Sequence, residues 1–599
     1  MPYKKNDNFY GGSTKKDTTK TNKRTSPKNS ATTATKPWAP KPERTPRTPT
    51  YRKTGASNIN RKKSDFVQKT KATRAGWYDE VTIPTLPRNM TRTENGAIAY
   101  ATTGKALLDL NYQISTMRQW DENKITSAWR KAYSENPRLA IRWLGYLMSV
   151  RSGQGERRSS RIILKDIANN GGAHIIVNLL NYLVELTRWD IVYDLLNNTD
   201  AYDAVANLIR KQWKQDVWAM NHNKPCSLMA KWISSANSKS TDTRKEGLLT
   251  CKILGLNETQ YRKTLSMLRK YIDVVERKMC SNNWQAIDYE KVPSKANLIY
   301  NKAFLRHDEE RRRAYLGALD KGEAKINSSV AYPHDIVHKY ANGNVYWGRN
   351  FIKDYDSALE AMWRSLPDMV KDGSSTIVCR DDSGSMTIGV DPKHSNVSAL
   401  EVATALSIYF AERCKGPYHN KFFSFSETPK IMELDGKKSL HDKLEYCYNH
   451  SEVANTNIEA LFDLILETAV KNHCDQSELP NNLLIISDGQ FDSMCCASTS
   501  RYNRGIPDTL FDTINKKYKR AGYKMPKLIF WNCSSRAGNM AIPVQEHNKF
   551  PAILVSGFSV NTLKMVMSNK TNPWDALVDT LMDPKWEKME ELAFGNVIY

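Results

Sequence analysis

The sequence predicts a multidomain protein in which an all-α helical module is followed by an α/β domain with a doubly wound sheet. Three observations predict this fold class. The chain has 599 residues, more than one hydrophobic core organises. Apolar residues recur at three- and four-residue spacing through most of residues 76–370, whereas short apolar runs alternate with helical patterns in 371–599. Residues 1–75 contain almost no aliphatic side chains and form a separate basic tail.

The composition excludes several classes of protein. Hydrophobic residues make up 40% of the chain, which is enough for folded domains. No stretch of consecutive apolar residues is as long as a membrane span, which needs about 18. The first residues also lack the apolar core of a secretory signal. The ten cysteines are scattered without a C-x-x-C pair, a pattern typical of reduced thiols and not of a disulfide framework or a zinc site. We therefore expect a cytoplasmic protein with no membrane contact.

Positive charge is concentrated in the first two segments. Residues 1–75 hold 20 Lys and Arg against 4 Asp and Glu, a net charge of +16. Residues 371–599 hold 25 against 28, a net charge of −3, so +11 of the total +24 falls in residues 76–370. The tail and the helical module can therefore attract a polyanion by net charge, whereas the α/β domain cannot.

The tail, residues 1–75, is expected to be disordered, because its prolines prevent helix formation and it has too little apolar surface to offset the entropy of ordering. Its charge is typical of a segment that captures RNA or DNA phosphates, with Trp38 and Tyr51 available to stack on bases. The alternative is a solubilising tail or an arm that binds an acidic protein surface.

Residues 76–370 are predicted to form irregular helical pairs, either an α-solenoid or a ring. Loops with Gly, Asn and Pro separate the helical stretches. The helical patterns lie at 106–110, 139–150, 175–186, 189–196, 204–218 and 261–278.

Three loops in this module carry basic residues that are candidates for RNA contact. The first has two glycines beside a helix start, where backbone amides and arginines together favour a phosphate. The second joins a lysine to Trp232, for which a place in the core is the alternative. In the third, the basic residues fall roughly on one helical face. The candidates are Arg151, Arg157, Arg158 and Arg161 in the first loop, Lys231 in the second, and Lys295, Lys302 and Arg306 in the third. The alternative for all of them is a solvated surface.

Five short motifs carry a resemblance to a known family. They are Glu94–Ala97, Val150–Arg157, Ala230–Trp232, Val292–Lys295 and Tyr332–Val337. Together they resemble an uncharacterised family, found in phages, giant viruses, bacteria and plants, that joins a TROVE-like helical module to a von Willebrand A domain. The layout is similar to that of the Ro (TROVE) RNA-binding proteins, whose HEAT-like ring binds RNA ends in its hole and structured small RNAs outside. The resemblance covers about residues 90–599, and for a viral chain it implies the host cytoplasm.

The α/β segment, residues 371–599, is predicted to hold a mostly parallel sheet. Strand patterns and helical patterns alternate along it. The strands are expected at 376–379, 421–426, 430–434, 482–487, 527–531 and 551–556, and the helices at 399–413, 458–470 and 508–521, with a closing helix that begins at 561–567.

Oxygen-bearing side chains follow the ends of these strands. Asp381, Ser383 and Ser385 alternate in one tight loop after an apolar run, Thr456 precedes a helix and Asp488 ends another strand. Parallel strands deliver such residues to one sheet edge, and oxygen-only ligands suit Mg²⁺ or another divalent cation such as Mn²⁺ or Ca²⁺. The pattern is similar to the metal-ion-dependent adhesion site of von Willebrand A domains, a resemblance that implies these five residues as ligands, directly or through water.

Two residues depart from that family pattern. Asp382 adds a carboxylate, from which we expect either stronger cation binding or repulsion of an acidic partner. Asn455 follows Ala454 where glycine is usual before the threonine, and we expect it to stiffen the loop.

We therefore expect a non-enzymatic, Ro-like ribonucleoprotein scaffold. The tail and the helical module would bind RNA, either a small structured RNA or RNA ends, and the cation would hold an acidic residue of a protein partner. One alternative is a protein-interaction or virion-associated protein without specific RNA binding. Another is a metal-dependent nuclease, but Asp492 is the one obvious extra carboxylate and the histidines lack metal-ligand spacing.

Overall fold

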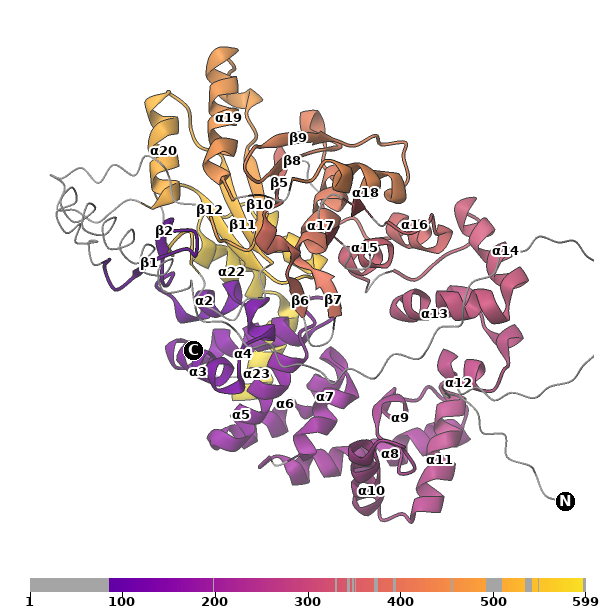
Figure 1. Cartoon of the computed structure of the whole chain (residues 1–599). Helices are drawn as coiled ribbons and strands as arrows, with labels where there is room; N and C mark the ends of the chain where they lie inside the picture. Colours follow the sequence, from indigo (N-terminus) through magenta and orange to yellow (C-terminus); the bar gives the residue numbers. More distant parts are fainter. Residues whose placement is uncertain are drawn as a thin grey trace, which may run out of the picture. The chain divides into compact units, whose positions relative to one another are not determined.

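The computed structural model describes residues 86–595, apart from 198, 329–330, 342–344, 347–348, 351, 371–374, 392–394, 453, 455, 492–508, 534–540 and 548. The described chain is rich in helices and carries one six-stranded sheet in its C-terminal part (Figure 1). Within the described residues, no helix combines the length and the apolar character needed to cross a bilayer. The predictions for residues 1–75, for Asn455 and for Asp492 concern positions outside the described ranges.

The described chain begins with a β-hairpin. Strand β1 (Met90–Arg92) pairs antiparallel with β2 (Ile98–Tyr100), and the turn between them contains Asn95 and Gly96. Gly96 has a φ of +96°, a backbone conformation that glycine adopts without a steric penalty. The helical periodicity of residues 76–370 did not predict this short hairpin.

Helices make up most of the following segment, and sequence signals explain where they begin and end. Between helix α3 (Glu122–Glu135) and helix α4 (Pro137–Met148), the Asn136 side chain accepts a 3.0 Å hydrogen bond from the Leu139 amide, and Pro137 occupies the first helical position. The longer helices are α3 (Glu122–Glu135), α4 (Pro137–Met148), α5 (Arg158–Ile167), α6 (Ala173–Leu186), α8 (Tyr202–Asn221), α10 (Thr241–Leu254), α11 (Glu258–Tyr271), α13 (Ser294–His307) and α14 (Glu309–Asp320). The shorter ones are α2 (Ala106–Tyr112), α7 (Trp189–Tyr193), α9 (Met229–Trp232), α12 (Val275–Cys280), α15 (Pro333–Ala341) and α16 (Ser357–Arg364). The predicted helical character of this region is confirmed.

The sheet has the order β12-β11-β10-β5-β8-β9, and the predicted, mostly parallel arrangement is confirmed. All neighbouring strands are parallel except β8 and β9, which form a hairpin. The strands are β5 (Thr376–Asp381), β8 (Lys421–Phe425), β9 (Lys430–Glu433), β10 (Asn482–Ser487), β11 (Lys527–Asn532) and β12 (Ala552–Ser556). Between β5 and β8 the chain also forms the small β6–β7 pair (Gly389–Asp391 and Ser395–Ser398).

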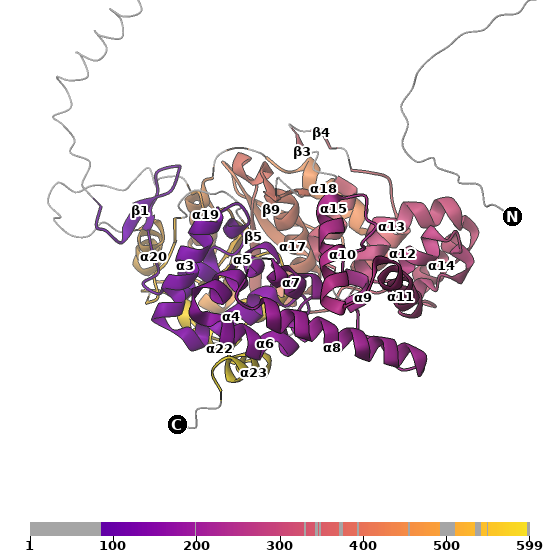
Figure 2. The same ribbon diagram turned by 90° about the horizontal axis from the view of Figure 1, so that it is seen from below.

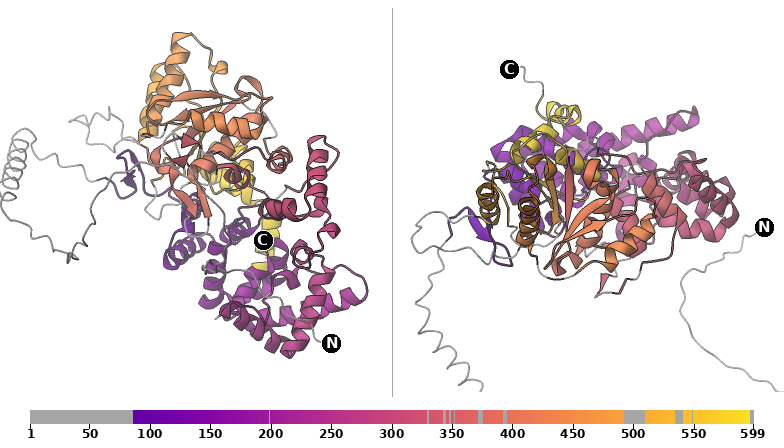
Figure 3. Two further views of the ribbon diagram at one scale, coloured as in Figure 1. Left: turned by 45° about the vertical axis from the view of Figure 1, so that its right-hand side comes forward. Right: turned by 90° about the horizontal axis from the view of Figure 1, so that it is seen from above.

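Helices cover both faces of this sheet (Figures 1 and 3). In β5, Ile377 and Cys379 belong to the core that includes α19 (Ile458–Lys471) and α20 (Leu510–Arg520). Val378, between them, belongs to the other core, which includes α17 (Ala399–Arg413). Successive side chains of a strand point to opposite faces, so burial on both sides requires the continuous apolar runs seen in the sequence.

The C-terminal helices return to the helical segment. After α18 (Leu440–Asn449), α21 (Leu563–Val566) and α22 (Pro573–Leu581), the last helix α23 (Pro584–Phe594) packs against α4 and α6 (Figure 2). Trp586 is 1% exposed, and the Glu590 carboxylate accepts a 2.7 Å hydrogen bond from Arg138 and another from Arg142. One hydrophobic core therefore runs from the first helices to one face of the sheet.

Candidate functional site

The candidate cation site lies at the carboxyl edge of two neighbouring parallel strands. Asp381 is the last residue of β5, and Asp488 directly follows β10. Thr456 lies two positions before α19, in a loop whose Ala454 carbonyl accepts a 3.2 Å hydrogen bond from the Gly384 amide. Asp381, Thr456 and Asp488 are each at most 2% exposed. Three loops thus meet at one edge, as the strand order requires.

Hydrogen bonds within the first loop fix the orientation of its oxygens. The Ser383 amide donates to Asp381 Oδ1 at 2.9 Å, and the hydroxyls of Ser383 and Ser385 are 3.0 Å apart. The hydroxyl of Ser487, the last residue of β10, donates to Asp381 Oδ2 at 2.5 Å. Ser487 therefore positions the Asp381 carboxylate from the neighbouring strand, a role that the sequence did not reveal.

The two carboxylates lie close enough to repel each other. Burial raises the pKa of Asp381 above its ordinary value, and the negative charge of Asp488 raises it further. The same charge acts on two other buried groups: burial raises the pKa values of Tyr112 and Cys533, and Asp488 adds to both shifts. The edge is thus a site of concentrated negative potential.

The donor set fits a hard divalent cation. The loops provide carboxylate oxygens from Asp381 and Asp488 and hydroxyl oxygens from Ser383, Ser385 and Thr456. Mg²⁺ prefers oxygen ligands and would neutralise the two carboxylates, of which Asp488 raises the pKa of Asp381. The five ligands remain a prediction, and each of them would bind through oxygen.

Asp382 does not join this site, and both expectations for it are wrong. Its side chain is buried and forms an ion pair with Arg380, with Nε 2.6 Å from Oδ1. Arg380 Nη2 also donates to Asp382 Oδ2 at 2.7 Å, and the Ser424 hydroxyl donates to the same oxygen. Alternation along the strand explains this placement, because residues 380 and 382 point to the side opposite Asp381. The Asp382 carboxylate is therefore a structural, neutralised group.

The β1–β2 turn binds the loop that follows Asp488. The Thr93 hydroxyl donates to the Phe491 carbonyl at 2.6 Å, and the Asn95 side-chain amide donates to the Gln490 carbonyl at 2.6 Å. The Glu94 amide donates in turn to Gln490 Oε1 at 2.8 Å. We call this turn, residues 93–97, the clasp. One motif of the family resemblance thus contacts the loop that follows Asp488.

The end of α2 and the residues after it cover the ends of β11 and β12. The Asn532 side-chain amide donates to the Tyr112 carbonyl at 2.7 Å, and the Ser115 hydroxyl donates to the Asn532 carbonyl at 3.2 Å. The Ser115 and Ser556 hydroxyls are 2.9 Å apart. The helical segment therefore closes this part of the sheet edge beside the candidate cation site.

Arg157 and Arg161, two of the predicted RNA contacts, lie together in the structure. Arg161 forms a 2.6 Å ion pair with Asp190, which Arg188 also contacts. Burial lowers the pKa of Arg157, and the positive charges of Arg188 and Arg161 lower it further. Three guanidinium groups therefore surround one carboxylate and leave excess positive charge. The sequence analysis missed Arg188, which precedes a short helix without a glycine-rich signature.

The other residues of the first basic loop point elsewhere. Arg158 donates a 3.3 Å hydrogen bond to the Met117 carbonyl, and Arg151 is exposed. The four arginines predicted there thus do not form one group.

The remaining predicted basic residues lie on two helices, α9 and α13. Lys231, in α9, is 3.7 Å from Glu276, and Lys295, in α13, forms a 2.6 Å ion pair with Asp335. Lys302 and Arg306 are exposed further along α13. Trp232 is partly buried, with the Arg188 guanidinium 3.8 Å from its ring centre.

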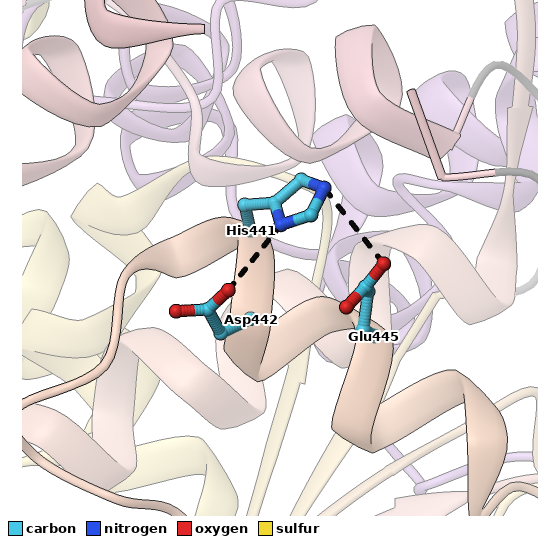
Figure 4. A group of neighbouring side chains, drawn as sticks. All are labelled: His441, Asp442 and Glu445. Carbon is cyan, nitrogen blue, oxygen red and sulfur yellow. Dashed lines mark hydrogen bonds and ion pairs between the residues drawn. The ribbon is translucent and has the colours of Figure 1, made fainter. Parts of the chain in front are cut away.

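A second group of potential metal ligands lies on α18 (Figure 4). Asp442 lies 3.5 Å from Nδ1 of His441, whereas Glu445 lies 3.9 Å from Nε2, at the other edge of the ring. The two carboxylates thus meet different ring nitrogens and are exposed to solvent. This arrangement is explained by polar contacts of one imidazole ring on the helix surface and does not need a metal.

Comparisons with known proteins find similarity in the regions that carry these features. Residues 374–591 match a domain of unknown function, DUF7788, and residues 253–375 match another, DUF2828. The chain is 27% identical over 554 residues to the uncharacterized protein L728 of Acanthamoeba polyphaga mimivirus, a match that covers 85% of this chain and 91% of that protein. The five candidate cation ligands all lie in the DUF7788 match, and the chain is similar over most of its length to an uncharacterised viral protein.

Proposed function

We propose that the chain is a non-enzymatic scaffold that binds a divalent cation at the carboxyl edge of its sheet and uses it to hold an acidic group of a protein partner. The observation that carries the proposal is the meeting of the Asp381, Thr456 and Asp488 loops, with buried carboxylates that repel each other. A cation such as Mg²⁺ removes that repulsion. Its octahedral shell also accepts further oxygen ligands, which a partner carboxylate supplies.

The sheet supports the assignment of residues 371–599 as a von Willebrand A domain with a metal-ion-dependent adhesion site. Its strand order is that of an open doubly wound sheet, with the order reversing between β5 and β10. Ligands of such sheets bind beyond the carboxyl ends of the strands at this reversal. Asp381 and Asp488 follow those two strands, so the candidate ligands occupy the position that the topology favours.

RNA binding is the second function that we propose for this scaffold. The observation that favours it is the group formed by Arg157, Arg161 and Arg188, where three cations share one carboxylate. Excess guanidinium charge at a surface attracts phosphates, and the net charge of the tail, residues 1–75, adds to the attraction. The helical segment is then a TROVE-like RNA-binding module, with the cation site reserved for a protein.

Calorimetric titration of the full chain with Mg²⁺ tests the cation site. We expect one ion per chain, and at least tenfold weaker binding in Asp381→Asn, because this variant removes ligand charge and keeps the shape. Glu467→Ala is the matched control, since Glu467 is an exposed carboxylate on α19 in the same domain. Equal Mg²⁺ affinity in Asp381→Asn and the control contradicts the assignment.

The partner and the RNA are tested separately. A partner held through the cation binds wild type in Mg²⁺, and it is lost both on chelation and in Thr456→Ala.

RNA affinity is expected to survive Asp381→Asn. If wild type instead cleaves RNA in Mg²⁺ and Asp381→Asn does not, the protein is a nuclease and the scaffold proposal is wrong. RNA affinity that is unchanged by deletion of residues 1–75 and by Arg157→Gln with Arg188→Gln shows that RNA binds elsewhere on the chain, whereas absence of RNA binding by wild type removes the second function.

A further inference from the structure

A groove of about 900 Å³ lies between α9, α11 and α12. Its basic lining residues are Lys231, Arg262, Lys263, Arg269 and Arg277. Among the lining residues that the structure describes, Glu276 is the only acidic one. The groove therefore has a strong excess of positive charge, of which the sequence analysis identified Lys231 alone.

We propose that this groove binds the phosphodiester backbone of single-stranded RNA, a proposal that rests on the RNA-binding part of the proposed function and gives it a location. The charge of the surrounding helices supports it. Residues 202–280 contain 15 Lys and Arg against 7 Asp and Glu, a net charge of +8. This segment thus carries most of the positive charge of residues 76–370.

The groove has a fixed wall. Arg269 donates hydrogen bonds of 2.8 Å to the Ala230 carbonyl, 2.7 Å to the Ser235 hydroxyl and 2.8 Å to the Ile233 carbonyl. These bonds attach the loop after α9 to α11, and burial lowers the pKa of Arg269. Arg269 is therefore a structural residue. A groove held in shape before binding loses less entropy when a ligand enters.

The ligand contacts fall to other side chains. Arg262, Lys263 and Arg277 are exposed, and the 3.6 Å pair of Arg262 with Glu258 is a surface contact that solvent screens. Asn237 and Thr259, which also line the groove, add donors for phosphate or ribose oxygens. The exposed cations are thus available to an incoming polyanion.

The lining favours a nucleic acid over an acidic protein. Besides cations, hydroxyls and amides, the described lining contains the aliphatic Leu265 and Val274 but no Trp, Tyr or Phe. Buried aromatic anchors provide most of the affinity in protein interfaces, whereas phosphates can be held by cations alone. Aromatic rings would also stack bases, so in this groove the expected contacts are with the RNA backbone and not with the bases. An acidic peptide is therefore the competing ligand to be tested.

Further cations lie beyond Lys231, outside the lining of the groove. The Lys231 ammonium group lies 5.7 Å from the centre of the Trp232 ring, and the Arg188 guanidinium lies 3.8 Å from it. Arg188 in turn meets Arg161 at Asp190. A strand of RNA in the groove therefore finds further cations at the α9 end.

Cys280 provides a reporter in the full chain, because it lines the groove and is exposed. We would measure its alkylation rate by peptide mass spectrometry with and without a twelve-residue oligouridylate, with EDTA present throughout. The expected result is several-fold slower alkylation of Cys280 and no change at the partly exposed Cys474. A glutamate homopolymer of equal length serves as the competing polyanion.

A matched pair of triple variants tests the cations themselves. Replacing Arg262, Lys263 and Arg277 by Gln removes three charges from the groove, and replacing Lys211, Lys214 and Lys252 by Gln removes three exposed charges outside its lining. The groove variant is expected to weaken oligouridylate binding at least tenfold. It should also reduce the slope of log affinity against log salt by about 2, since each phosphate contact on a single strand contributes about 0.7. The control variant is expected to change the oligouridylate affinity and the salt slope much less.

The outcomes separate this inference from the proposed function. Strong oligouridylate binding without Cys280 protection, or equal losses in the two triple variants, overturns the groove and leaves RNA binding elsewhere on the chain. Protection by the glutamate polymer but not by RNA assigns the groove to a protein. Absence of any RNA binding overturns both the groove and the RNA-binding part of the proposed function, whereas Mg²⁺ titration judges the cation site independently.

Discussion

The Thr93 hydroxyl donates a 2.6 Å hydrogen bond to the carbonyl of Phe491, a residue 398 positions further along the chain. The bond joins the clasp to the loop that begins at Asp488, so the first described hairpin supports a loop of the candidate cation site. Asn95 adds a second bond to the same loop, through the Gln490 carbonyl.

Asn95→Ala is therefore expected to weaken cation binding although Asn95 is not a ligand. Loss of one hydrogen bond of about 0.5–1.5 kcal/mol corresponds to roughly a two- to tenfold lower Mg²⁺ affinity, because the Asp488 loop becomes less well ordered. Asn123→Ala, which removes an exposed amide on α3, is the control. Calorimetry with Mg²⁺ measures both, and an affinity in Asn95→Ala equal to that of the control refutes the role of the clasp.

The Arg380–Asp382 pair predicts a large effect on stability. Both side chains are buried, so Arg380→Met leaves the Asp382 carboxylate uncompensated in the core. We expect the free energy of unfolding to fall by about 3–5 kcal/mol. Adding Asp382→Leu should restore part of the loss, because the unpaired charge is then gone. Denaturant unfolding of both variants tests this, and a double variant no more stable than Arg380→Met argues against a purely structural Asp382.

The stabilisation by Mg²⁺ should depend on pH. The pKa of Asp381 in the folded protein is raised by burial and by Asp488, so without a cation its contribution to stability falls as the pH rises from the unfolded pKa through the folded one. A bound cation reverses this effect, whereas protons compete with it at low pH. At 100 times the dissociation constant, Mg²⁺ should contribute about 2.7 kcal/mol at pH 8 and clearly less at pH 5. Thermal unfolding with Mg²⁺ or EDTA measures the difference, and equal gains at both pH values would falsify the linkage.

The packing of α23 on α4 predicts the effect of a side chain at Gly145. A Cβ atom there would lie 2.7 Å from Met589 Sδ and 3.0 Å from the Trp586 ring. Gly145→Val should destabilise the protein by about 1–3 kcal/mol, because it overpacks this contact. Gly317→Ala, on α14, meets no atom within 4 Å and should instead stabilise its helix by about 0.5–1 kcal/mol. Denaturant unfolding of the two variants measures both changes in the free energy of unfolding. If Gly145→Val leaves that free energy unchanged, the described packing is contradicted.

Much of the α/β fold follows from local sequence signals. The apolar runs of β5 and β10 are continuous because both faces are buried, and they end where polar ligands begin. Asp381 and Asp488 were therefore predictable as neighbours. The start of α17 was equally clear, since Ser398 and Glu401 form a capping box.

Other features depend on contacts that no local pattern records. The clasp joins residues almost 400 positions apart, and its Asn-Gly turn predicts a hairpin without indicating what the hairpin binds. Asp382 was misread because composition places it among ligands, whereas strand alternation turns it toward Arg380. Arg188 and the groove were missed because their cations come from separate helices that only the fold brings together.

The most direct test of the central claim is Mn²⁺ binding to the full chain, followed by electron paramagnetic resonance of the free ion. Wild type is expected to bind one Mn²⁺ that Mg²⁺ displaces, while Asp381→Asn, Thr456→Ala and Asp488→Asn each lose that ion and Glu467→Ala keeps it. Loss in all three variants supports one site built from three loops. Binding that persists in these variants, or no bound Mn²⁺ in wild type, contradicts the account.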